Sequence, residues 1–178
     1  MNSVQTIAGV SGGSFRIGII RYKIPFEDYF LDYLTEKKLE AMQLWESEEI
    51  VLFSVKSPLA DKKAISGQEL DRLTEVVYSD SDMPYSNLGK KRIRDEAHKK
   101  ITVCERGSSL ELLSEISGTF MHSAPLPKKI LKRYGLIQRK CGGEGYAYRL
   151  IFRNGYKLSD NDKLFIENLY AVKNETEI

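Results

Sequence analysis

The sequence has little of what builds covalently cross-linked or metal-bound scaffolds. Among its 178 residues are two cysteines and two histidines. Two cysteines are too few for a disulfide-stapled fold, and the sequence contains neither a CxxC motif nor two histidines at metal-ligand spacing. We therefore expect Cys104 and Cys141 to be reduced thiols in a reducing cytoplasm, and we expect no metal and no cofactor.

Signals for membranes and for nucleotide or hydrolase chemistry are also missing. No apolar run approaches the roughly 18 residues that a spanning helix needs, and the N-terminus lacks a basic region followed by an apolar stretch. We therefore expect a cytoplasmic protein without membrane contact. No GxGxxG motif follows a strand, and there is no Walker loop or nucleophile elbow. His122 lies beside apolar residues, so its expected role is structural, with a role as a base the alternative.

Composition and length favour one globular domain. Hydrophobic residues at 42% and charged residues at 29% are typical of a chain that folds around a core. The length is close to that of a single domain. We expect residues 1–14 to form a flexible N-terminal tail, 15–173 a single domain and 174–178 a C-terminal tail.

Apolar periodicity predicts strands joined mainly by hairpins, with helices between them. A helix or a broken helix pair is expected over 26–45, because large apolar residues recur there at three- and four-residue spacing. Shorter helices are expected over 109–116 and over 125–134, the latter ending at Gly135. The expected strands are 15–24, 49–55, 73–78, 84–93, 136–140, 147–153 and 163–172, and 101–105 is a further candidate for a short strand. The fold class is therefore α+β, a mainly antiparallel six- or seven-stranded sheet with about three helices packed on it.

Positive charge is concentrated late in the chain, although the net charge is only +2. Residues 128–153 carry 8 basic side chains against one acidic residue, Glu144. Clustered positive charge attracts anionic ligands, from small carboxylates to phosphate backbones. With Tyr134 and Tyr146 as stacking surfaces, nucleic-acid binding is a third hypothesis for function, and a solvated basic surface is the structural alternative.

Motifs spread over residues 26–171 share the order and spacing of a known family. They are 125–135 (PLPKKILKRYG), Tyr148-Arg149, Gly155 and 165–170 (FIENLY), and upstream 72–78 (RLTEVVY) with Asp82 and Pro84. This set resembles the chorismate pyruvate-lyases, and residues 30–55 look like that family's opening helix and first core strand. The resemblance implies a cofactor-free lyase that cleaves chorismate to 4-hydroxybenzoate and pyruvate.

The resemblance also implies roles for individual residues. Arg72 would match the arginine that grips a carboxylate of the substrate, because a guanidinium offers two parallel donors. Leu126 would match the residue whose backbone amide meets the ligand, and Arg149 a further substrate-binding arginine. Glu167 would match the acid that helps proton transfer, so Glu167 and Arg72 are the candidate catalytic residues. Pro127 departs from the family's glycine and offers no amide.

Other interpretations stay open. The alternative for Arg72 is a surface residue paired with Asp71 or Glu75, and for Glu167 a solvent-facing residue on an edge strand. The alternative function is a non-catalytic domain of the same fold that binds a small carboxylate, resembling the effector domains of some transcription regulators. The expected partner is a small aromatic or enolpyruvyl carboxylate, and the oligomeric state is left undefined.

Overall fold

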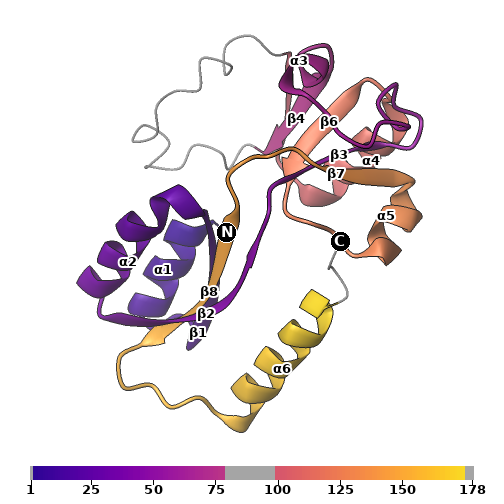
Figure 1. Ribbon diagram of the computed structural model, residues 1–178. Coiled ribbons are helices and arrows are strands. Elements are labelled where there is room, and N and C mark those ends of the chain that lie inside the picture. The colour runs from indigo at the N-terminus through magenta and orange to yellow at the C-terminus, as the bar shows by residue number, and fades with distance from the viewer. Residues whose placement is uncertain (1, 79–98, 175–178) are drawn as a thin grey trace. The chain divides into compact units, whose positions relative to one another are not determined.

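The computed structural model describes residues 2–78 and 99–174. These residues belong to two compact units: unit 1 lies within Met1–Ser47 and Glu144–Ile178, and unit 2 within Glu48–Gly143. The fold class is α+β, as predicted, but the strands form two sheets (Figure 1). The expected strand 84–93, the turn at Asp82 and His98 lie outside the described residues. Among the described helices, none combines the length and apolar character that a bilayer crossing requires.

Unit 1 is built on a three-stranded sheet of order β1-β8-β2, in which β8 pairs antiparallel with both neighbours. Leu44, Leu150 and Ile166 form the buried cluster that holds α6 against this sheet. The elements of unit 1 are α1 (Ser3–Ser11), β1 (Ile17–Lys23), the 3-10 turn η1 (Ile24–Phe26), α2 (Glu27–Glu36), β2 (Leu39–Ser47), β8 (Tyr146–Arg153) and α6 (Asp160–Asn174).

Helix α1 forms where a flexible tail was expected. Asn2 and Gln5 make a capping box, each side chain accepting from the other's backbone N–H at 2.9–3.0 Å. Ile7 and Val10 are fully buried. The helix approaches β1 closely at Gly18, where an added Cβ would lie 3.0 Å from Val10 Cγ2. Residues 3–11 are therefore part of the unit, and the Ser- and Thr-rich composition concealed two core residues.

The helix expected over 26–45 ends at Glu36. Lys38 adopts a φ of 55° and reverses the chain, and β2 begins at the next residue. The apolar residues after this turn face the core from a strand whose register shifts between Gln43 and Trp45. This bulge adds one residue to the strand, so the alternation of core-facing and outward-facing side chains is interrupted. Met42 and Trp45 are therefore three residues apart, which is the spacing of apolar residues in a helix.

Unit 2 is built on a five-stranded mixed sheet of order β5-β4-β6-β3-β7. Strand β3 is antiparallel to β6 and β7, whereas β4 is parallel to β5 and β6. The sequence pattern did not predict β6. The elements of unit 2 are β3 (Ile50–Ser54), α3 (Gly67–Leu70), β4 (Thr74–Tyr78), β5 (Lys100–Val103), α4 (Arg106–Glu115), β6 (Thr119–Ser123), α5 (Lys128–Tyr134) and β7 (Leu136–Lys140).

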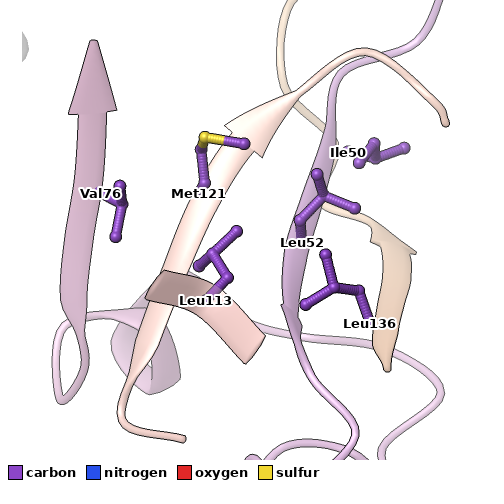
Figure 2. Packing of buried hydrophobic residues seen from close by; sticks show 6 residues of the cluster. All are labelled: Ile50, Leu52, Val76, Leu113, Met121 and Leu136. Atoms are coloured by element: carbon purple, nitrogen blue, oxygen red, sulfur yellow. The ribbon is translucent and has the colours of Figure 1, made fainter. Parts of the chain in front are cut away.

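Strand β3 is buried along its whole length because both faces of the sheet are covered. Successive residues of a strand point to opposite faces. On one face lies the cluster drawn in Figure 2, which comprises Ile50, Leu52, Val76, Leu113, Met121 and Leu136. The opposite face carries Val51, Phe53, Leu59, Leu70, Leu73 and Phe120. Within 49–55, apolar residues stand at consecutive positions because both faces of this strand are buried and both need apolar side chains.

Candidate functional site

The residues singled out from the sequence fall into both units. Arg72 and Leu126 belong to unit 2, and Arg149 and Glu167 belong to unit 1. Arg72 lies in the exposed turn between α3 and β4. Within residues 2–78 and 99–174, its guanidinium makes no hydrogen bond or ion pair, so the alternative pairing with Asp71 or Glu75 is not formed there.

The backbone amide of Leu126 is engaged within unit 2. It donates to Gln138 Oε1 at 2.9 Å, which ties the loop before α5 to β7. Pro127 is the N-cap residue of α5 with φ −57° and provides no amide of its own. A ligand that used the Leu126 amide would therefore have to replace the side chain of Gln138.

Arg149 lies on the central strand of unit 1 and is held by two side chains. Its guanidinium donates to Tyr22 Oη and forms an ion pair with Glu27, the first residue of α2. Burial lowers the pKa of Arg149, but the hydrogen bonds to Glu27 and Tyr22 outweigh it and raise the pKa overall. Burial also raises the pKa of the Tyr22 hydroxyl. This arrangement gives Arg149 a structural role, and its role in substrate binding stays a prediction.

Glu167 lies on an exposed face of α6, so the expectation of a strand over 163–172 is wrong. Ser159 and Asp162 start this helix, since Asp162 Oδ2 accepts from both the N–H and the hydroxyl of Ser159 at 2.7–2.8 Å. Ile166, next to Glu167, is the one buried residue of the helix. The capping pattern SDND is a sequence signal for a helix, and the prediction of a strand did not use it.

A second group of polar side chains comes together in unit 2. Glu49 directly precedes β3, His122 lies on β6, and Cys141 directly follows β7. His122 Nδ1 is 3.8 Å from Glu49 Oε2 and 3.9 Å from Cys141 Sγ. The Cys141 thiol donates to the backbone carbonyl of Glu49 at 3.4 Å. We call these three residues the Glu-His-Cys cluster.

Strand pairing explains why the Glu-His-Cys cluster was missed in the sequence. Cys141 is 92 residues from Glu49 and 19 from His122, so no local spacing joins them. In the sheet, Val51 lies opposite both His122 on β6 and Arg139 on β7. Residues two apart on a strand share a face, so all three members extend the face of Val51 at one end of the sheet. Only knowledge of the strand order could have grouped them.

Comparison with known proteins identifies the fold. No protein-family model matches the chain, and no curated protein sequence matches it significantly. The effector-binding domain of QuiR, solved in complex with shikimate, superposes with a TM-score of 0.63 at 16% identity, covering 98% of this chain and 78% of that one. The oxidised form of OxyR gives a TM-score of 0.63 at 13% identity, covering 98% and 79%.

HinK, a LysR family transcriptional regulator from Pseudomonas aeruginosa, gives a TM-score of 0.61 at 11% identity. This chain covers 56% of HinK, and 96% of this chain is matched. The chain therefore has the fold of the effector-binding domains of LysR-type regulators. At these identities the likeness defines the architecture alone.

The resemblance to chorismate pyruvate-lyases is wrong. The fold is that of a different family, and nothing in it supports cleavage of chorismate to 4-hydroxybenzoate and pyruvate. The resemblance depended on short motifs, and the one containing Glu167 was interpreted as a strand but is a helix. A short motif outside its expected structural context carries no role with it.

Proposed function

We propose that this chain is a binding domain for a small carboxylate ligand, which it recognises without converting it. The observation that carries the proposal is the fold, which 98% of the chain shares with an effector-binding domain solved with shikimate. Shikimate is itself a small cyclic carboxylate. On the sequence alone, this function, a non-catalytic domain that binds a small carboxylate, is the alternative to a lyase. The α+β class is the expected one, but the fold is that of effector-binding domains and not that of chorismate pyruvate-lyases.

Arg72 is the proposed carboxylate-binding residue. Its side chain is exposed, and no described residue pairs with its guanidinium. A guanidinium can donate two parallel hydrogen bonds to one carboxylate, which gives both affinity and a fixed orientation. Arg149 is a weaker candidate, since a ligand would have to compete with Glu27 for its donors.

Thermal denaturation in the presence of small acids tests the proposal. The panel contains shikimate, 4-hydroxybenzoate and succinate at matched ionic strength. The methyl ester of each acid is the control, because it lacks the carboxylate charge. A ligand that binds only the folded state raises the melting temperature by mass action. We expect at least one acid to do so while its ester does not. If no acid in such a panel, extended to other small carboxylates, shifts the transition, the proposed ligand class is wrong.

A further inference from the structure

The Glu-His-Cys cluster offers three different metal-ligand atoms at one end of the unit 2 sheet. The carboxylate, imidazole and thiol atoms of Glu49, His122 and Cys141 all lie within 4.8 Å of one another. His122 lies on β6, while Glu49 and Cys141 lie directly beside the ends of β3 and β7, and these three strands are neighbours in the order β6-β3-β7. Paired strands hold their backbones in register, so the three side chains start from fixed positions.

The distance between Glu49 and His122 fits a shared ion better than a direct hydrogen bond. The 3.8 Å between Glu49 Oε2 and His122 Nδ1 exceeds the length of a hydrogen bond. In a tetrahedral zinc site, bonds of 2.0–2.3 Å place neighbouring donor atoms about 3.4–3.6 Å apart. Glu49 Oε2 and Cys141 Sγ are 3.8 and 3.9 Å from His122 Nδ1, so these two distances need to shorten by only a few tenths of an ångström, and the three ligand atoms all lie within 4.8 Å of one another.

The same geometry argues against a nucleophilic triad. In a relay, the base uses one ring nitrogen for the nucleophile and the other for the orienting carboxylate. Here, Glu49 and Cys141 both approach Nδ1 of His122. Because both groups face the same ring nitrogen, the arrangement favours chelation of an ion over a proton relay.

Burial and charge favour a divalent cation at this point. The side chain of Glu49 is 1% exposed, and a divalent cation among these three ligand atoms would place positive charge next to this buried carboxylate. The side chain of His122 is 25% exposed, which leaves a route for an ion. Gly143 lies against the carboxylate, because an added Cβ would lie 1.8 Å from Glu49 Oε2. The backbone of the loop after Cys141 therefore helps to fix the position of Glu49.

We propose that the Glu-His-Cys cluster binds one Zn²⁺ ion through Glu49 Oε2, His122 Nδ1 and Cys141 Sγ. Nitrogen and sulfur donors select zinc over Mg²⁺ and Ca²⁺, which prefer oxygen ligands. On binding, the Cys141 thiol releases its proton to solvent, and the thiolate and carboxylate together balance the two positive charges of the ion. Three protein ligands leave a fourth position for water or another donor. The site does not depend on the proposed carboxylate ligand.

Zinc titration of the metal-free full chain against a chromophoric chelator tests this site, with no small carboxylate present. We expect one Zn²⁺ per chain. Loss of a supporting group outside a coordination sphere weakens metal binding about 10–100-fold, so Cys141→Ser, which removes a ligand, should weaken it by about 100-fold or more. Cys104→Ser is the matched control, because Cys104 is an exposed cysteine outside the cluster, and it should bind like the wild type.

Two further measurements test the zinc site even if the Cys141→Ser variant misfolds. Co²⁺ added in place of zinc should give thiolate-to-metal charge-transfer absorption in the wild type and in Cys104→Ser, but not in Cys141→Ser. His122→Asn, at a partly exposed position, should weaken Zn²⁺ binding while the circular dichroism spectrum is retained. Absence of stoichiometric zinc binding, or equal loss in Cys104→Ser and Cys141→Ser, would overturn the site.

Discussion

Arg149, on the central strand of unit 1, forms an ion pair with Glu27 at the start of α2 and donates to the hydroxyl of Tyr22. The ring of Tyr22 in turn stacks on Phe30 of α2 with centroids 4.5 Å apart. The guanidinium of Arg149 thus joins the first turn of α2 to the sheet of unit 1. The predicted contact of Arg149 with a ligand remains to be tested.

Arg149→Ala should destabilise the protein. The substitution removes hydrogen bonds to a charged partner at a position where the arginine side chain is 14% exposed, so we expect a loss of about 2 kcal/mol in the free energy of unfolding. Urea denaturation followed by circular dichroism measures this loss. Lys37→Ala, which breaks the exposed pair with Glu36, is the control and should cost less than about 0.5 kcal/mol. An unchanged midpoint for Arg149→Ala together with lost ligand binding would reassign Arg149 to a binding site.

Arg72→Lys should weaken carboxylate binding without loss of stability. Lysine keeps the charge but cannot donate two parallel hydrogen bonds, so we expect affinity to fall about 10-fold or more. Arg133→Lys is the matched control, because Arg133 is an exposed arginine of α5 that lies over Tyr134. Fluorescence or calorimetric titration compares the two variants. Equal affinities for wild type and Arg72→Lys would remove Arg72 from the site.

The start of α3 should make stability depend on acid pH. Hydrogen bonds from Lys62, and then from the backbone and hydroxyl of Ser66, lower the pKa of Glu69 from 4.5 to about 2. A carboxylate with a lowered pKa stabilises the fold above pH 4.5 and loses that contribution as the pH falls through about 2. Over this range, Glu69→Gln and Lys62→Met should each show a shallower fall in the free energy of unfolding than the wild type. Parallel curves would show that the interaction adds no stability.

Gly135→Ala should weaken the end of α5. Gly135 ends the helix with φ 59° and ψ 44°, a left-handed conformation that costs other residues about 1 kcal/mol or more. Urea denaturation should therefore show a loss of about this size. Gly118→Ala is the control, since an added Cβ there meets no atom within 4 Å. An equal effect of both substitutions would mean that backbone conformation at Gly135 is not the cause.

Local signals in the sequence predicted the elements that local physics determines. Gly135 was identified as the residue that ends its helix, and 49–55 as a buried strand. The errors occurred where tertiary packing or an irregularity decided the outcome. The bulge near Trp45 imitated helical spacing, and α6 was taken for a strand because the Ser159–Asp162 cap was overlooked.

The Glu-His-Cys cluster shows which kind of functional site could not be predicted from the sequence. Its members were seen separately: His122 as a structural residue and Cys141 as a reduced thiol, while Glu49 marked only the edge of an apolar run. Their grouping depends on the order of β6, β3 and β7, which is set by long-range pairing and by the sharing of apolar faces. The strand order that brings Glu49, His122 and Cys141 together is therefore visible only once the complete fold is known.

Calorimetric titration of the wild-type chain with a small acid and its methyl ester tests the central claim most directly. The acid is the one that raises the melting temperature most. The account predicts saturable binding of the acid at one site per chain and at least about 10-fold weaker binding of the ester, because the ester cannot form a charge-assisted bidentate contact. Equal affinity for acid and ester, or no saturable heat of binding with any small carboxylate, would contradict the proposal that this chain binds a carboxylate ligand.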